Sequence, residues 1–442
     1  MYIFTLPSGL RFLHIANNSS VSHFGIMINA GTRDENPYEN GCAHLIEHSL
    51  FKGTKNQSSK SISIAFDHIG AEINAYTTKE DTCFHFSFLS EYYPKIMKTC
   101  ADMLFNSCFP EKEIVKEINV IKEEILSCLD SPAESIFDDF ENNLFNGHSI
   151  GRNILGTNES LDSIIHNLNI VKGFYEENYL NNEIIIWSNG NLTDKRFRFL
   201  CEKYFGDSPL KSTQRNRTTV DKNSRFDVVE DKEIFQCNTI IGGNAYSFFD
   251  KGREAFTLLN FMLGNDGLSS QLNYQVREKY GLVYHIESSY NPYCDTGAFS
   301  IFYECEYANN ERVRNIVLKE LNKCKNNLLG TNKLSTAKKQ LKGSLAVAAD
   351  SRLNDTISSA KSLLVFNKVE PMENVFKKID GITSEEILSV ASESVYLVDR
   401  KILVPTRLSL VPSRFFLSNY QISHLFPCNI RLAINRSIQR VW

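Results

Sequence analysis

The sequence predicts an α+β protein made of two halves of similar size. Both halves contain short runs rich in apolar and aromatic residues, typical of strands, and longer segments with apolar residues at three- and four-residue spacing, typical of helices. A polar, basic stretch with almost no apolar residues, Ser208 to Arg225, lies near the middle of the chain and has the composition of a linker. The second half then repeats the order of strands followed by helices.

Length and composition agree with this division. A chain of 442 residues, 42% of them hydrophobic, is long enough for roughly two or three ordinary domains. We expect domains at residues 1–210 and 226–411, a linker at 211–225, and a basic C-terminal extension at 412–442. The net charge of −4 is small, and no basic stretch interleaved with aromatic residues predicts a nucleic-acid partner.

The sequence shows no sign of secretion or of insertion into a membrane. The N-terminal residues MYIFTLPSGLRFLHI lack the basic region, apolar run and cleavage site of a signal peptide. No run of about 18 apolar residues follows. The eleven cysteines are scattered and form no CxxC pair, which is typical of reduced thiols. We therefore expect a cytoplasmic protein without a membrane partner.

The expected elements follow one another along each half. The first half opens with a hairpin formed by Tyr2–Phe4 and Leu10–Ile15 around Pro7-Ser8-Gly9. Its further strands are expected at 23–29, 83–88 and 183–189, and its helices at 57–69, 91–106, 111–129, 132–145 and 195–205. In the second half we expect strands at 239–243 and 298–303, a terminal strand ending near 411, and helices at 253–263, 311–326 and 332–349.

The segment HLIEH, His44 to His48, carries the clearest chemical signal. Positions i and i+4 of a helix lie on the same face, so His44 and His48 can present two imidazole nitrogens to one metal ion. Glu47 lies one turn after His44, within reach of a water molecule on that metal. The alternative is a solvent-facing helix whose histidines are merely exposed.

A catalytic zinc site usually takes three protein ligands, so a third is expected elsewhere. The best candidates lie in EKEIVKEINVIKEEI, residues 111–125, which has the apolar spacing of a helix. Glu117 and Glu124 are two turns apart and share one face. One could ligate the metal and the other could orient a ligand histidine or the water. The alternative is a solvated acidic stripe, and spacing alone does not choose between these.

HLIEH is the inverted form of the HExxH zinc motif. The sequence resembles the pitrilysin, insulin-degrading enzyme and mitochondrial processing peptidase superfamily, in particular its short bacterial-type branch. In that family the third ligand is a glutamate in a string like VILEEI, which VIKEEI at 120–125 matches. The resemblance therefore implies that Glu124 is the ligand and that Glu117 is the acidic residue that supports a ligand.

Three further motifs carry the resemblance, in the family's order. Residues 2–35 resemble its opening strands. GAEINAYTTKEDT at 70–82 resembles its substrate-binding edge strand, with Asn74 and Ala75 at the matching positions. LGNDGLSSQLNYQVREKYGLVY at 263–284 resembles the signature of the second half, in which an arginine and a tyrosine contact the substrate, here Arg277 and Tyr284.

The resemblance implies two homologous α+β domains, each an antiparallel sheet flanked by helices, that face each other as a clamshell. Residues 1–210 would bind one Zn²⁺, and residues 226–411 would be the inactive, substrate-binding domain. The implied activity is that of a zinc metalloendopeptidase acting on unfolded or extended peptides in a closed chamber. Glu47 would be the general base, and Arg277 and Tyr284 would stabilise the oxyanion once the clamshell closes.

Several alternatives stay open at this stage. In the short branch two chains commonly pair, so a homodimer is the simplest expectation and a heterodimer with a homologous subunit is its rival. The chain could instead be a catalytically silent structural or partner subunit of a processing peptidase. If the chain is an enzyme, peptide degradation competes with the processing of precursors, in which basic presequences enter an acidic chamber. Asp138, Asp139 and Glu141 could line such a chamber or could equally form a solvated helix face. For the basic extension at 412–442, a contact with a partner or a nucleic acid is one alternative, and the expected one is an extension that packs on the body of the protein or lacks fixed structure; the resemblance says nothing about it.

Overall fold

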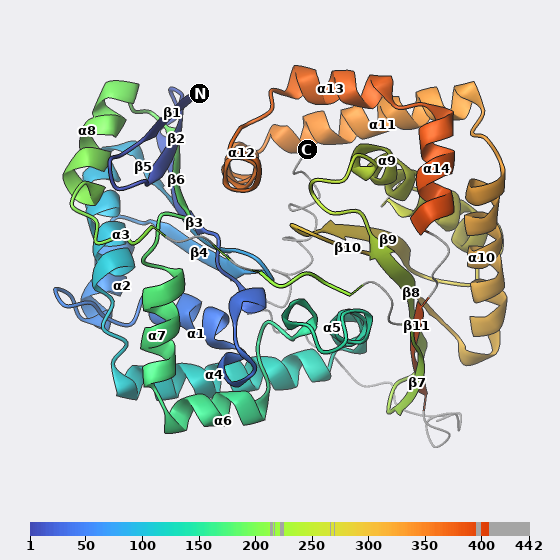
Figure 1. Ribbon diagram of the computed structural model, residues 1–442, viewed down its shortest axis with the longest axis horizontal. Coiled ribbons are helices and arrows are strands. Elements are labelled where there is room, and N and C mark those ends of the chain that lie inside the picture. Colours follow the sequence, from blue (N-terminus) through green and yellow to red (C-terminus); the bar gives the residue numbers. More distant parts are fainter. Residues whose placement is uncertain are drawn as a thin grey trace.

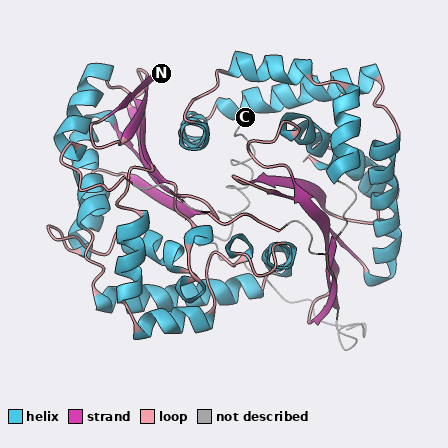
Figure 2. Ribbon diagram, viewed as in Figure 1, coloured by secondary structure: helices cyan, strands magenta, loops and turns pink. Residues whose placement is uncertain are grey.

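Two β-sheets, one in each half of the chain, form the framework of the protein (Figure 1, Figure 2). This computed structural model describes residues 1–212, 215, 217–221, 225–265, 267–268, 270–394 and 399–405. Most helices lie at the outer margins of the view, and the two sheets lie nearer to its middle.

The first sheet has six strands in the order β1-β2-β6-β3-β5-β4. They are β1 (Tyr2–Thr5), β2 (Arg11–Ala16), β3 (Val21–Ile28), β4 (Glu72–Thr77), β5 (Thr82–Leu89) and β6 (Ile184–Gly190). Strand β6, with the sequence IIIWSNG, is buried along its whole length, as expected of a strand between two neighbours and covered on both faces. Strand β4 lies at the free edge, which agrees with the expectation of an edge strand.

The second sheet has five strands in the order β7-β11-β8-β10-β9. They are β7 (Asp227–Lys232), β8 (Cys237–Ala245), β9 (Ile286–Pro292), β10 (Gly297–Cys305) and β11 (Asp399–Pro405). Its strand order reproduces that of the first sheet without β1. Even the position of the parallel pair is the same, because β2 and β6 are parallel in the first sheet and β7 and β11 in the second.

Helices fill the connections in the same order in both halves. The first half contains α1 (Cys42–Ser49), α2 (Ser59–Asp67), α3 (Tyr93–Asn106), α4 (Glu111–Leu129), α5 (Pro132–Leu144), α6 (Asn158–His166), α7 (Asn169–Asn178) and α8 (Asp194–Phe205). The second half contains α9 (Arg253–Gly264), α10 (Asn310–Asn326), α11 (Thr331–Ala349), α12 (Arg352–Phe366), α13 (Met372–Gly381) and α14 (Ser384–Ser394). The expectation of two similar α+β halves is thus confirmed, except that each sheet contains one parallel pair.

The two halves exchange one helix each. Helix α5 of the first half packs on the second sheet, and α12 of the second half packs on the first sheet (Figure 1). The first contact buries Ile136, Phe140 and Leu144 against Ile240, Phe302 and Leu403. The second buries Ala360, Leu363 and Leu364 against Leu13, Met27, Ile185 and Trp187. Separating the halves would expose both apolar clusters to water, so the exchange favours one compact unit.

The stretch predicted as a linker contacts the first half in its described part. Arg215 and Arg217 both form ion pairs with Asp34, at 3.0 and 2.8 Å. Arg33 reaches the second half through Asp295, at 2.7 Å. These ion pairs therefore hold the linker and the second half against the first half.

The helices and strands expected from the sequence are present, with ends that differ by a few residues. Local sequence patterns did not predict α6, α7, α12, α13, α14, β7 or β9. The terminal strand, β11, is described as far as Pro405, and the expectations for residues 406–411 and for the extension at 412–442 lie outside the described residues.

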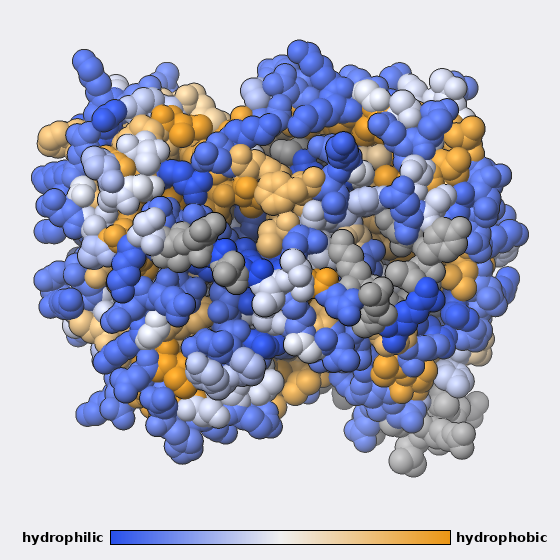
Figure 3. Space-filling model, viewed as in Figure 1, coloured by the Kyte–Doolittle hydropathy of each residue, from blue (hydrophilic) through white to orange (hydrophobic). Residues whose placement is uncertain are grey.

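The visible surface is mostly hydrophilic, and hydrophobic residues gather near its centre, where the two halves meet (Figure 3). Among the described residues, no helix combines the length and the apolar character needed to cross a bilayer.

Candidate metal centre and active site

Helix α1 is held at its N-terminus by a buried carboxyl group. Its N-cap residue Gly41 has φ +94°, and a Cβ there would lie 2.9 Å from the carbonyl oxygen of Leu155. No side chain of the N-cap satisfies the first N–H groups. Instead, Glu35 accepts hydrogen bonds from the backbone N–H of Gly41 (3.0 Å) and Ala43 (2.8 Å), and from the Asn40 side chain (3.0 Å). Burial raises the pKa of Glu35 to about 8, although these donors oppose the shift.

His44, His48 and Glu124 come together between α1 and α4. Each offers one ligand atom, and these atoms lie within 4.8 Å of one another. The Nε2 atom of His44 is 3.8 Å from one oxygen of Glu124, and the Nε2 atom of His48 is 3.7 Å from the other. Helix α1 orients these residues because its other side, with Cys42, Leu45 and Ile46 among others, is buried in the core.

This donor set fits zinc. Two imidazoles and one carboxylate are a common ligand set of catalytic zinc sites, and a tetrahedral site would place neighbouring ligand atoms roughly 3.4 Å apart. The observed separations of 3.7 and 3.8 Å are close to that value. The Glu124 side chain is 37% exposed, whereas the His44 side chain is 11% exposed, so the cluster is open to solvent on the side of Glu124. The structure thus brings the three predicted ligands together.

Glu117 contacts one of these histidines from behind. Its Oε2 lies 3.2 Å from Nδ1 of His48, and its Oε1 lies 2.8 Å from Nζ of Lys52. Burial alone would raise the pKa of Glu117, but the hydrogen bonds from His48 and Lys52 outweigh it and leave the pKa lowered. An ionised Glu117 fixes the proton of His48 on Nδ1 and leaves Nε2 available toward Glu124.

Glu47 lies beside the cluster and is buried, with 9% of its surface exposed. Burial raises its pKa to about 7, and the neighbouring His48 and a hydrogen bond from Thr77 partly offset this. The hydroxyl of Thr77, at the end of β4, donates to Oε2 of Glu47 at 2.5 Å. A carboxyl group with a pKa near neutrality can both accept and release a proton.

Asn74 and Ala75 lie on the free edge of the first sheet. Asn74 pairs with His85 and Ala75 with Phe84 of β5, and no strand of the described residues pairs with the other edge of β4. The backbone N–H of Ala75 donates to the side-chain oxygen of Asn74, at 2.8 Å. This edge has the geometry that an added peptide strand requires.

Arg277 and Tyr284 contact each other in the second half. The Arg277 guanidinium lies 5.5 Å from the centre of the Tyr284 ring, and the Tyr284 side chain is prominent at the surface. Arg277 lies in a π-helical turn, Asn273–Glu278. Among the described contacts, none joins these two residues to the cluster of His44, His48 and Glu124. The structure therefore brings them to each other but does not bring them to the metal ligands.

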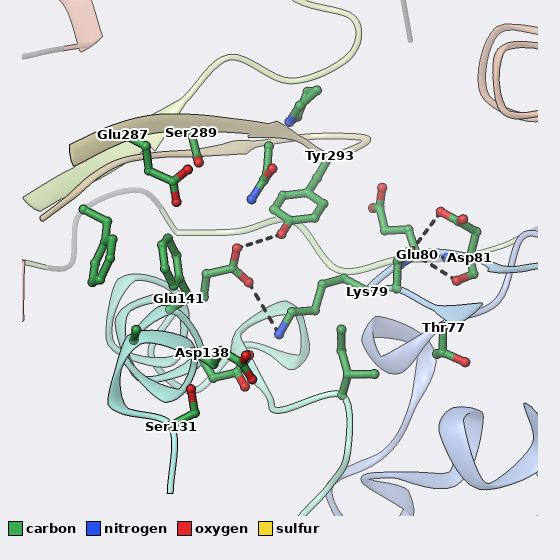
Figure 4. A pocket seen from close by; sticks show the side chains of 18 of the residues that line it. Thr77, Lys79, Glu80, Asp81, Ser131, Asp138, Glu141, Glu287, Ser289 and Tyr293 are labelled. Atoms are coloured by element: carbon green, nitrogen blue, oxygen red, sulfur yellow. Dashed lines mark hydrogen bonds and ion pairs between the residues drawn. The ribbon is translucent and has the colours of Figure 1, made fainter. Parts of the chain in front are cut away.

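A cavity of about 320 Å³ lies between the two halves, next to Thr77 (Figure 4). Its walls come from the β4–β5 turn, α5, β9 and β10, with Lys361 of α12. Seven carboxyl groups line it, namely Glu80, Asp81, Glu134, Asp138, Glu141, Glu287 and Glu304, against the two lysines Lys79 and Lys361. Asp138 and Glu141 lie there as the sequence analysis suggested, whereas Asp139 lies 3.9 Å from Lys401 of β11.

A second group of possible ligands, Glu80, Cys294 and Asp295, is occupied by an arginine. The Arg33 guanidinium lies 2.8 Å from Glu80, 2.7 Å from Asp295 and 3.2 Å from the Cys294 sulfur. The guanidinium satisfies these acceptors, so this group is an ion-pair network rather than a metal site.

Thr77, Lys52 and Glu35 are the site residues that sequence reasoning missed. Thr77 lies in the motif at 70–82 and Lys52 lies four residues after HLIEH, but nothing in a linear pattern shows which side chain will contact Glu47 or Glu117. Glu35 lies six residues before Gly41, and only the path of the intervening loop brings it to the start of α1.

Comparisons with known proteins agree with this arrangement. Residues 11–158 match the insulinase family, peptidase family M16, and residues 167–341 match the peptidase M16 inactive domain. An uncharacterized zinc protease of Streptomyces coelicolor is 30% identical over 398 residues, covering 88% of this chain and 86% of that protein. The uncharacterized zinc protease YmxG of Bacillus subtilis is 29% identical over 392 residues, covering 88% of this chain and 94% of that protein.

Solved structures share the fold. A protease from Helicobacter pylori superposes with a TM-score of 0.84 at 20% identity, covering 91% of this chain and 99% of that chain. The peptidase M16 inactive domain from Pseudomonas fluorescens superposes with a TM-score of 0.82 at 18% identity, covering 92% of this chain and 98% of that chain. Because the matches cover both halves and most of the Streptomyces coelicolor protein, this chain belongs to peptidase family M16, the insulinase family, among bacterial relatives named zinc proteases.

Proposed function

We propose that this chain is a zinc metalloendopeptidase that hydrolyses unfolded or extended peptides, with one Zn²⁺ per chain held by His44, His48 and Glu124. The observation that carries the proposal is the convergence of these three side chains beside the buried Glu47. If the HxxEH sequence merely lay on an exposed helix, no carboxylate from α4 would be expected beside its two histidines.

Bound zinc would supply a Lewis acid that polarises the peptide carbonyl and makes water more acidic. Glu47 is the proposed general base, which takes a proton from the attacking water and delivers it to the leaving amine. Burial of Glu47 raises its pKa above the ordinary value, which favours acceptance of the proton. Thr77 holds one carboxylate oxygen of Glu47, and Glu117 orients His48.

The proposed peptide lies as an added strand along β4, where Asn74 and Ala75 offer a free edge. A carbonyl oxygen of the peptide would replace the Asn74 side chain as the acceptor for the Ala75 N–H. Backbone pairing of this kind favours extended peptides over folded proteins. Arg277 and Tyr284 are the proposed groups of the second half that contact the peptide and stabilise the oxyanion.

The proposed assembly is a homodimer, with a heterodimer of homologous subunits as the rival. The two halves of one chain share two apolar clusters and the Arg33–Asp295 ion pair. The scattered cysteines favour a reducing compartment, so the proposal includes a cytoplasmic location.

The test compares the wild type with Glu47→Gln and with the matched control Glu123→Gln, an exposed glutamate beside Glu124. We expect all three proteins to bind close to one zinc per chain, and only Glu47→Gln to lose hydrolysis of an unstructured peptide, by at least about a hundredfold. A wild type that binds zinc and cleaves nothing would instead favour the silent-subunit alternative. A wild type without zinc would contradict the metal assignment.

The acidic cavity favours a second candidate, the processing of precursors with basic segments. One oxygen of Glu134 is buried there and has no hydrogen-bond partner among the described residues. A lysine or arginine side chain of a peptide would supply the missing donor. For Glu134→Gln we expect a rise in KM for a peptide containing arginine and no change for the same peptide with glutamine in its place. Equal KM values for both peptides in the wild type would exclude this specificity.

A further inference from the structure

The turn between β4 and β5, residues Thr78–Asp81, joins the two halves of the chain at two points. Glu80 accepts a hydrogen bond from the backbone N–H of Cys294, at 3.0 Å. Asp81 forms an ion pair with Lys361 of α12. Both contacts join the first sheet, with β4 at its free edge, to the second half of the chain. The second half contains none of the proposed metal ligands.

The Lys361–Asp81 pair is almost completely buried. Lys361 is 8% exposed and Asp81 is 2% exposed. Lysine is rarely buried unless it is paired, because its charge is costly to remove from water. Asp81 also accepts a hydrogen bond from the Thr78 hydroxyl at 2.9 Å, and its carbonyl oxygen accepts one from the Thr78 N–H at 2.7 Å. The pair therefore fixes the shape of the turn as well as its position.

The residue that precedes this turn holds the proposed base. Thr77 is the last residue of β4, and its hydroxyl donates to Glu47. Figure 4 shows Thr77 on the same side of the cavity as Lys79, Glu80 and Asp81. A short run of contacts thus leads from α12 through the turn to the carboxylate of Glu47.

We propose that Lys361 is a positioning residue for Glu47: it fixes the Thr78–Asp81 turn from the second half, and the turn holds Glu47 through Thr77. The inference rests on the proposed function of Glu47 as the base. The second half, which contains Lys361 but no proposed metal ligand, would therefore affect the chemical step. None of the proposed ligands His44, His48 and Glu124 takes part in this run of contacts, so we expect zinc binding to be independent of Lys361.

The experiment uses the full chain loaded with zinc. Lys361→Met alone would leave a buried Asp81 without its cation, so the double variant Lys361→Met with Asp81→Asn is measured beside it. Lys368→Met is the matched control, because Lys368 is a lysine just beyond α12 whose side chain is 68% exposed. The measured quantities are kcat, KM, zinc content, melting temperature and the amide hydrogen exchange of residues 72–82.

We expect the double variant to keep one zinc and a KM within about twofold of the wild type, while kcat falls by at least about tenfold, because small displacements of a base are costly. Exchange in residues 72–82 should be faster even without substrate. In a Thr77→Val background the same double substitution should change kcat by less than about twofold, since its route to Glu47 is already broken.

Three outcomes would overturn the inference: a kcat close to that of the wild type, a rise in KM alone, or a full effect in the Thr77→Val background. Loss of zinc or of the folded state in the double variant would also overturn it, since that outcome indicates a purely structural pair. Failure of the wild type and of Lys368→Met to cleave would instead contradict the proposed function itself.

Discussion

Replacing Glu35 with alanine tests how the metal-binding helix is held. Helix α1 has only eight residues, which is too short for it to be stable without support from its surroundings. The substitution leaves three buried N–H groups without an acceptor: those of Gly41 and Ala43 and one of the two on the Asn40 amide, whose other N–H keeps the carbonyl oxygen of Asn153. At about 1 to 2 kcal/mol each, the loss in the free energy of unfolding is about 3 to 6 kcal/mol.

That loss corresponds to a drop in melting temperature of roughly 6 to 24 °C for a domain of this size. We also expect zinc affinity to fall by about tenfold or more, because α1 carries two of the three proposed ligands and their geometry depends on its start. The assay combines thermal unfolding of the zinc-free protein with competition for zinc against a chelator.

Glu39→Ala is the matched control, since Glu39 bonds Asn36 at the surface of the same loop. Its melting temperature should change by at most about 4 °C, because exposed hydrogen bonds contribute little. If Glu35→Ala melted within about 2 °C of the wild type and kept its zinc affinity, the reasoning that Glu35 anchors α1 would be wrong.

Three further predictions concern other parts of the molecule. Burial lowers the pKa of His85 to about 4, below its ordinary 6.5, so the wild type should lose stability as pH falls from about 6.5 toward 4. His85→Gln should recover about 2 to 3 kcal/mol of that loss at pH 4.5, measured by urea unfolding, and an unchanged acid sensitivity would contradict the assignment. Glu117→Gln should weaken zinc binding about tenfold to a hundredfold in a chelator competition while leaving the fold intact, because His48 loses its charged partner. Arg33→Met should destabilise the protein by about 3 to 5 kcal/mol, because it leaves the buried Glu80 and the half-buried Asp295 without their main cation. The control is Arg198→Met, which replaces an exposed arginine. Equal melting temperatures for the two variants would refute a role of Arg33 in joining the halves.

Local sequence patterns were sufficient for most of the elements in the first half. The strand β6 is predictable because a run of isoleucines bounded by polar residues has few alternatives to a buried strand. Helix α4 is predictable because Ile114, Ile118 and Ile121 recur at helical spacing, and these residues are indeed buried. The elements that were missed carry weaker patterns. Strand β7, for example, lies at a sheet edge and is half exposed, so its sequence DVVEDK shows little hydrophobic contrast.

The sequence by itself was sufficient for the family resemblance, the two-part α+β organisation and the candidate ligands. His44 and His48 follow from i and i+4 spacing on one helix, which is a local property, whereas Glu124 follows from the resemblance of VIKEEI to the family's motif. Only the tertiary structure decided that α5 and α12 exchange sheets, that Thr77 contacts Glu47 and that Lys361 pairs with Asp81. These contacts join residues far apart in the chain, and their formation depends on how the sheets and helices pack. The sequence gives the spacing of side chains along one helix or strand, but it does not give the distances between side chains of different helices and strands.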